Sequence, residues 1–77
     1  MVQAYILIQS EIGTTGDAVE WIAKIPGVVR VDAVTGPYDI VVLGEAPDLD
    51  HLGRMVVGQV QAVAGVTRTT TCTVVNL

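Results

Sequence analysis

Two stretches of this chain resemble each other at a spacing of 38 residues, counted from Gly27 to Gly65. Each contains the end of an apolar segment, then a glycine, then a run that begins Val-x-Arg (residues 25–31 and 63–69). A glycine directly after a periodic apolar segment is typical of a helix end, and a β-branched run is typical of a strand. The chain is therefore predicted to contain two β-α-β units in tandem.

The rest of the chain supplies the other elements of these units. Apolar residues spaced by three and four predict helices at about 17–25 and 48–64, with Thr14 or Thr15 and Asp48 as the N-caps. The strands are expected at about residues 2–9, 28–35, 38–45 and 66–75. The helices are expected to bury Ala18, Ile22, Ile25, Leu49, Leu52, Val56, Val60 and Val63.

Two tandem units of this kind interleave in the order β-α-β-β-α-β, which is the ferredoxin-like arrangement. Right-handed crossover connections place both helices on the same face of the sheet. We therefore predict one α+β domain over residues 1–77, with a four-stranded antiparallel sheet and two helices on one face.

The second face of this sheet is left without helices, although it is partly apolar. Apolar residues make up 51% of the chain and charged residues only 16%, and 77 residues cannot bury that much apolar surface unaided. We therefore expect dimerisation by packing of sheet on sheet, as a dimeric αβ-sandwich. The residues expected on the uncovered face include Tyr5, Leu7, Val41 and Leu43.

Composition argues against several classes of function. The net charge is −4 and the four basic residues are scattered, whereas nucleic-acid binding needs a clustered basic surface. The single cysteine fits a reducing compartment. No apolar run approaches the length of a membrane span, and the N-terminus lacks the basic segment of a signal peptide. The expectation is a soluble cytoplasmic protein that binds neither nucleic acid directly nor membranes.

Residues 35–39, Thr-Gly-Pro-Tyr-Asp, separate two β-branched runs. Gly36 can adopt a positive φ and Pro37 fixes its own φ, so a hairpin turn is predicted. The turn places Tyr38 and Asp39 at the start of the next strand. A loop with exposed backbone N–H groups beside a carboxylate suits a small zwitterion. The alternative is a purely structural hairpin in which Asp39 bonds to the turn backbone.

The last strand is rich in threonine, and Thr69, Thr71 and Thr73 fall on one of its faces. One interpretation is a half-solvated edge strand, because threonine is a good strand former. The other is a row of neutral donors that bind a carboxylate without adding charge.

No group of residues suggests catalysis. Asp48, Asp50 and His51 cluster at a predicted helix start, where capping explains them better than a metal site. Cys72 has no sequence neighbour that would make it a nucleophile. We therefore predict no enzymatic activity, no metal and no cofactor.

The succession of residues 25–28 (Ile-Pro-Gly-Val), 35–39 and 65–71 (Gly-Val-Thr-Arg-Thr-x-Thr) resembles the ligand-binding domain of the Lrp/AsnC, or feast/famine, transcription regulators, also called the RAM domain. The resemblance covers nearly the whole chain. It implies a ferredoxin-like αβ-sandwich, dimers formed through the sheets, and rings of dimers, often octamers. It also implies amino-acid effectors bound between protomers of neighbouring dimers.

Residue by residue, the resemblance implies that Gly36, Tyr38 and Asp39 hold the backbone groups of the effector, with Asp39 suited to the ammonium. It implies that Thr69 and Thr71 contribute hydroxyls from another subunit. Full-length members carry an N-terminal helix-turn-helix, which this sequence lacks. We expect a stand-alone member that senses or buffers an amino acid, or co-assembles with full-length Lrp/AsnC regulators.

Two other classes share this order of elements. A small dimeric α+β-barrel enzyme, of the monooxygenase or isomerase kind, needs a polar catalytic group between sheet and helices, where this sequence places aliphatic residues. An ACT-like regulatory domain shares the fold and the ligand class, and differs mainly in where the ligand lies.

Overall fold

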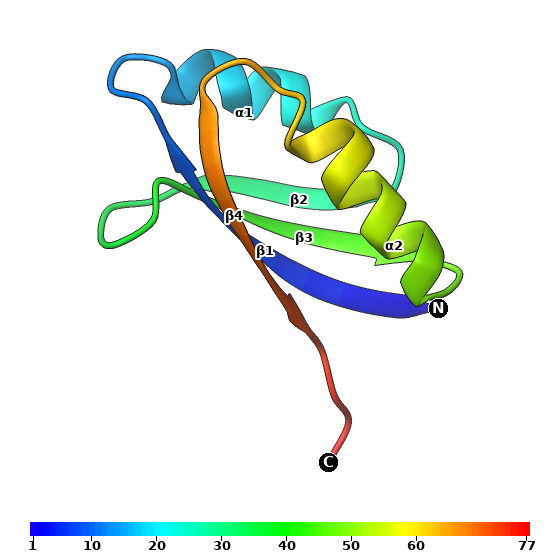
Figure 1. The fold of residues 1–77 in the computed structure, drawn as a ribbon. Coiled ribbons are helices and arrows are strands. Elements are labelled where there is room, and N and C mark those ends of the chain that lie inside the picture. Colours follow the sequence, from blue (N-terminus) through cyan, green and yellow to red (C-terminus); the bar gives the residue numbers. More distant parts are fainter.

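A computed structural model describes residues 1–77 and confirms the predicted order of elements (Figure 1). The fold is ferredoxin-like, a four-stranded antiparallel sheet with two helices. The elements are β1 (Val2–Ser10), α1 (Thr15–Ala23), β2 (Val28–Ala33), β3 (Ile40–Ala46), α2 (Leu49–Met55), a π-helical turn η1 (Val56–Val60) and β4 (Val66–Thr73).

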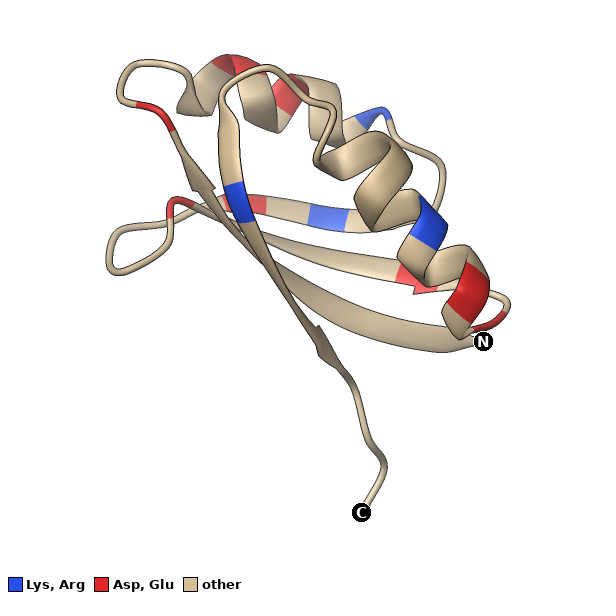
Figure 2. Cartoon of the chain, viewed as in Figure 1, with Lys and Arg blue, Asp and Glu red and all other residues tan.

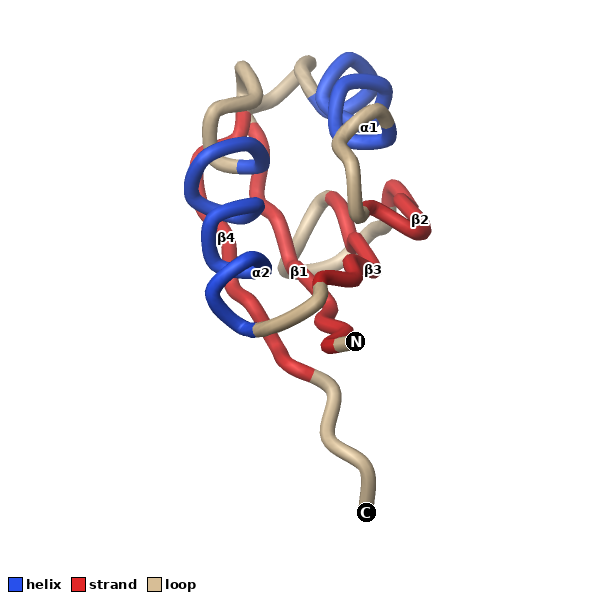
Figure 3. Tube along the Cα trace, turned by 90° about the vertical axis from the view of Figure 1, so that its right-hand side faces the viewer, coloured by secondary structure: helices blue, strands red, loops and turns tan.

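The strands lie in the order β2-β3-β1-β4, so β1 is central and β2 and β4 are the edges. Ile8 of β1 lies opposite Ile40 of β3 on one side and opposite Thr69 of β4 on the other. Seen from the side, the strands form one twisted layer, with α1 over β2 and α2 beside β4 (Figure 3). Both helices therefore cover the same face, as predicted.

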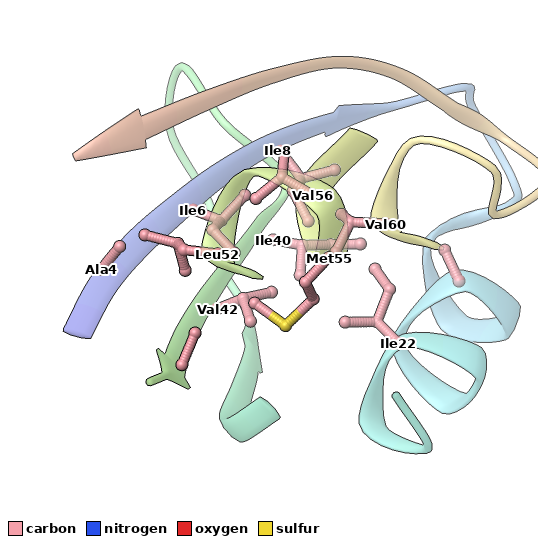
Figure 4. Close-up of a cluster of buried hydrophobic side chains, with 12 residues drawn as sticks. Ala4, Ile6, Ile8, Ile22, Ile40, Val42, Leu52, Met55, Val56 and Val60 are labelled. Carbon is pink, nitrogen blue, oxygen red and sulfur yellow. The ribbon is translucent and has the colours of Figure 1, made fainter. Parts of the chain in front are cut away.

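The core lies between this face and the two helices (Figure 4). Apolar residues at every second position of β1 and β3 meet the inward stripes of α1, α2 and η1, because strand side chains alternate between faces and helix side chains recur every three or four residues. The twelve core residues are Ala4, Ile6, Ile8, Ala18, Ile22, Ile40, Val42, Ala46, Leu52, Met55, Val56 and Val60.

Leu49 was predicted to be buried, and this prediction is wrong, because 62% of it is exposed. It is the first residue of α2 and lies on the flank of the helix that faces the edge strand β4. The threonines of β4 leave a groove at that edge. Met55, which the predicted stripe omitted, is buried instead and packs near Gly44.

Several boundaries differ from the predicted ones. The helix predicted at 17–25 spans Thr15–Ala23; Pro26 disfavours helical backbone at the residue before it. Thr14 occupies the N-cap, but its hydroxyl donates to Glu11 O (2.7 Å) instead of capping the helix. The second helix continues after Met55 as a single wide turn, η1, in which Gln61 N–H donates to Val56 O (2.9 Å).

The strand ends also differ. The predicted boundaries at residues 35 and 38 are wrong, because β2 ends at Ala33 and β3 begins at Ile40. The hairpin loop therefore contains six residues, 34–39, and is closed by a hydrogen bond from Val34 N–H to Asp39 O (2.9 Å). At the C-terminus β4 ends at Thr73, two residues earlier than predicted, and the remaining residues extend away from the body (Figure 1).

The two repeated glycines occupy equivalent places in the fold. Gly27 and Gly65 both have positive φ, +95° and +92°, after a helix and before a strand. The carbonyl of Gly27 accepts the Glu45 N–H (2.7 Å), and that of Gly65 accepts the Glu11 N–H (2.8 Å). Each glycine thus holds the end of a strand that belongs to the other β-α-β unit.

The uncovered face of the sheet carries the residues predicted for it. Leu7 pairs with Val41, and Tyr5 pairs with Leu43, so these four side chains share the face opposite the core. Tyr5 is 48% exposed, and the other three are half-buried although no helix covers them. This face carries partly exposed apolar side chains at the centre of the sheet.

Asp48 caps α2, as predicted. Its Oδ1 accepts the His51 backbone N–H (2.8 Å) and lies 2.7 Å from His51 Nδ1. These hydrogen bonds, the backbone one first, lower the pKa of the Asp48 carboxyl below its ordinary value of 3.8.

Replacing Asp48 by alanine is expected to lower the melting temperature at pH 7, because His51 N–H loses its acceptor. A carboxyl with a lowered folded-state pKa stabilises the fold above the unfolded value and ceases to do so as the pH falls through the folded value. The difference between wild type and variant should therefore shrink below pH 3.8. Thermal melts between pH 2 and 7 measure it; Asp17→Ala, in the first turn of α1, is the control. Equal melting temperatures at pH 7 would contradict the cap.

Candidate functional site

The loop of residues 34–39 is held against the end of β1. Gly36 has a φ of +132°, as the predicted turn requires. Gln9 Nε2 donates to Pro37 O (3.1 Å), which fixes the loop from the neighbouring strand. Most of the loop is exposed, whereas Tyr38 and Asp39 are half-buried. The predicted Gly36, Tyr38 and Asp39 therefore lie together at one end of the sheet.

The side chain of Asp39 bonds to β1 rather than to its own turn. Its backbone N–H donates to Ile8 O (2.9 Å), and its Oδ2 accepts the Ser10 backbone N–H (2.8 Å). The Oδ1 atom of Asp39 forms no hydrogen bond within the chain. The carboxylate is thus fixed by one oxygen and can accept a donor from a ligand with the other.

Ser10 is a neighbour of Asp39 that the sequence analysis did not predict. Besides its backbone bond to Asp39, its hydroxyl lies 2.7 Å from the Thr15 hydroxyl at the start of α1. The two residues Ser10 and Asp39 are 29 apart in the chain. Nothing in the local sequence links them, because their contact depends on β3 lying beside β1 in the sheet.

The three threonines do share one face of β4, and it is the face covered by the helices. Thr69, Thr71 and Thr73 lie opposite the core residues of β1. Since β4 is an edge strand, Thr69 is half-buried and the other two are exposed. The Thr69 hydroxyl accepts a hydrogen bond from Gln61 Nε2 (2.9 Å).

A groove runs between these threonines and the second helix. Its volume is about 360 Å³. One wall is hydroxylic and the other is mainly aliphatic. The lining residues are Leu49, Leu52, Gly53, Val56, Val57, Gln61, Thr69, Thr71 and Thr73.

One chain does not bring Asp39 and the threonines into one pocket. Asp39 precedes Ile40, and Ile40 and Thr69 lie on opposite sides of Ile8. Two strand spacings separate them, roughly 10 Å. The groove beside Thr69 does not include Asp39. A ligand that touches both motifs would therefore need two chains, which stays a prediction.

No cluster of charged or metal-binding side chains offers an alternative binding site. The four basic residues lie apart, on β2, α2 and β4 and at the end of α1 (Figure 2). No group of three or more histidine, cysteine, aspartate or glutamate side chains is arranged to hold a metal ion, and Cys72 is exposed. Neither helix has the length and apolar character needed to cross a lipid bilayer.

Comparison with known proteins assigns the family. The model of the Lrp/AsnC ligand binding domain matches residues 3–76. This chain belongs to that family. It is accordingly a ligand-binding domain of a transcription-regulator family, and the resemblance noted in the sequence is confirmed.

The Lrp/AsnC domain has relatives of two lengths. An uncharacterized HTH-type transcriptional regulator of Pyrococcus horikoshii is 34% identical over 71 residues, which cover 88% of this chain and 47% of the relative. The chain thus spans about half the length of the curated relatives it matches. The crystal structure of TTHA0845 from Thermus thermophilus is 34% identical with a TM-score of 0.94, and the match covers 100% of this chain and 96% of that one.

A third structure is a transcriptional regulator from Neisseria meningitidis in complex with L-Met. It is 23% identical, has a TM-score of 0.83, and the match covers 97% of this chain and 50% of that one. At this identity the likeness establishes the shared fold alone.

Proposed function

We propose that this Lrp/AsnC domain is a non-enzymatic module that binds a free amino acid and acts through protein assembly. The observation that carries the proposal is the Asp39 carboxylate, fixed by Ser10 through Oδ2 and free at Oδ1 beside an exposed loop. An ammonium group is the natural donor for that oxygen. The family membership supports a regulatory ligand, and the L-Met complex of the Neisseria relative supports the ligand class.

In this proposal the effector lies between chains. Gly36, Tyr38 and Asp39 of one chain hold its backbone groups, and Thr69 and Thr71 of another contribute hydroxyl groups near the carboxylate. The separation of the two motifs within one chain supports this division. The uncovered sheet face joins two chains into a dimer, and dimers join into a ring, with the octamer as the expected size.

The first test is a thermal-shift panel with the twenty amino acids. A ligand present at a hundred times its dissociation constant adds about 2.7 kcal/mol per site, which shifts the melting temperature measurably. A shift with one or a few amino acids would identify the effector. Absence of a shift with all twenty would remove the sensing proposal and leave an assembly domain.

Replacing Asp39 by asparagine is expected to weaken the affinity at least tenfold and so to reduce that shift markedly, while the fold stays intact. Asparagine keeps an oxygen that can accept the Ser10 N–H but loses the charge that pairs with an ammonium. Alanine is a poorer choice, because it leaves the half-buried Ser10 N–H without its acceptor. Isothermal titration with the identified amino acid measures the affinity.

The threonines provide the matched control for this experiment. Thr71→Val removes one hydroxyl from the groove, whereas Thr70→Val removes one from the opposite face of the same strand. Weakened binding in the first and wild-type binding in the second would support the site. Unchanged affinity in Asp39→Asn would remove the assignment of Asp39.

Assembly with full-length members of the family is the second part of the proposal. The uncovered, partly apolar sheet face is the surface that a full-length Lrp/AsnC regulator could share with this chain. Co-expression with such regulators from the same cell, followed by affinity purification, tests it. Recovery of this chain alone in every case would count against co-assembly.

A further inference from the structure

The flank of α2 and η1 beside the β4 groove carries two apolar side chains that are largely exposed. Leu49 is 62% exposed and Val57 is 66% exposed. They lie eight residues apart with Gly53 midway, so the three form one ridge that runs from α2 into η1. We propose that this ridge, flanked by Asp50 and Arg54, packs antiparallel against the same ridge of a second copy.

The glycines of this helix support close approach by another chain. A Cβ built on Gly53 or Gly58 meets nothing within 4 Å, and neither residue has a positive φ. Glycine in a helix interior costs about 1 kcal/mol relative to alanine. Nothing inside this chain requires that cost, whereas a glycine lets a second backbone approach closely.

The charges on this face are self-complementary. The ion pairs of the chain are Arg30–Asp32 and His51–Asp48, so Asp50 and Arg54 are both unpaired. A two-fold axis at Gly53 brings Leu49 of one copy to Val57 of the other. The same axis brings Asp50 of each copy near Arg54 of the other, which makes two equivalent pairs of opposite charge. This complementarity favours a second copy of the chain as the partner of this face.

The helices lie on the face of the sheet that contains the core, so the ridge is not part of the uncovered sheet face. Both can therefore be occupied at once. A single short helix face is smaller than the roughly 800 Å² per partner that a stable pair of chains needs. The helix contact is thus weak between single chains and gains strength between dimers already joined through their sheets.

Charge exchange tests the contact. Asp50→Arg and Arg54→Asp each place like charges across the axis, and each should weaken assembly beyond the dimer at least about tenfold. The double exchange restores opposite charges and should restore assembly. Mixing the two single variants should also yield mixed assemblies. Sedimentation velocity over a wide concentration range measures the masses, and Glu20→Arg, on the other helix, is the control.

The Gly53→Gln variant tests the helix contact independently of charge. The side chain has room within one chain and favours the helix, so the fold should be at least as stable. It obstructs the close approach of two ridges, so assembly beyond the dimer should fall. Circular dichroism melts at low protein concentration separate stability from assembly.

These experiments decide between this proposal and two alternatives, a protein that stops at the dimer and a ridge that serves the ligand groove. Wild-type protein that never exceeds a dimer overturns it, and so do single variants with wild-type masses. Variants that change the amino-acid shift without changing the mass also overturn it, because the ridge would then serve the ligand groove. The proposal rests on the assembling role of the domain but not on amino-acid binding, which the thermal-shift panel tests separately.

Discussion

Replacing Gly27 by alanine is expected to destabilise the domain by about 3 kcal/mol and to lower its melting temperature by roughly 12–24 °C. Alanine at a φ of +95° is strained by roughly 1–2 kcal/mol. Its Cβ would also lie 2.7 Å from Glu45 O, a backbone atom that cannot rotate away. Relief of that contact separates the Glu45 N–H from Gly27 O, a hydrogen bond worth about 1 kcal/mol.

Gly13 provides the matched control for this variant. Its φ of +85° is similar, but a Cβ built there meets nothing within 4 Å. Gly13→Ala should therefore show the backbone strain alone, roughly 1–2 kcal/mol. Chemical denaturation at fixed protein concentration gives both values. Equal losses in the two variants would mean that the contact with β3 contributes nothing.

Replacing Leu7 by lysine is expected to convert the proposed dimer into monomers. Leu7 lies on the central strand in the middle of the uncovered face, between Val41 and Thr70. An ammonium buried there without a partner costs several kcal/mol. A loss of about 4 kcal/mol weakens the dimer roughly a thousandfold. Light scattering coupled to size exclusion measures the mass.

Ile12→Lys is the control for the dimer experiment, because Ile12 lies fully exposed in the loop after β1. It adds the same charge without touching the sheet face, so it should remain dimeric. Circular dichroism establishes that both variants are folded. A Leu7→Lys variant with the mass of a wild-type dimer would show that the chains join elsewhere.

The fold was predictable because its determinants are periodic. The repeated glycines, the alternation along residues 2–8 and the right-handed crossover rule together require this order of elements and an uncovered face. The glycines and the alternation are local features of the sequence, and the crossover rule follows from the order of elements, so a single sequence is enough to apply all three. The wide turn η1 was not predictable, because apolar spacing by three and four fits several kinds of helical turn.

The candidate site was predictable only in part. The hairpin and its carboxylate follow from Gly36, Pro37 and Asp39 as residue types. The bond from Ser10 to Asp39 joins two strands that are neighbours only in space, and the exposure of Leu49 depends on the threonine edge beside it. Such details require the register of the sheet, which residue types alone do not fix.

The strand order β2-β3-β1-β4 has a consequence for how this protein is made. Neither β1 and β2 nor β3 and β4 are neighbours, so every pairing in the sheet joins the first β-α-β unit to the second. A growing polypeptide that contains only the first unit has no strand to pair with. Strand pairing can begin only after β3 has left the ribosome, because β3 pairs with both β1 and β2, and the sheet is complete only after β4 has followed.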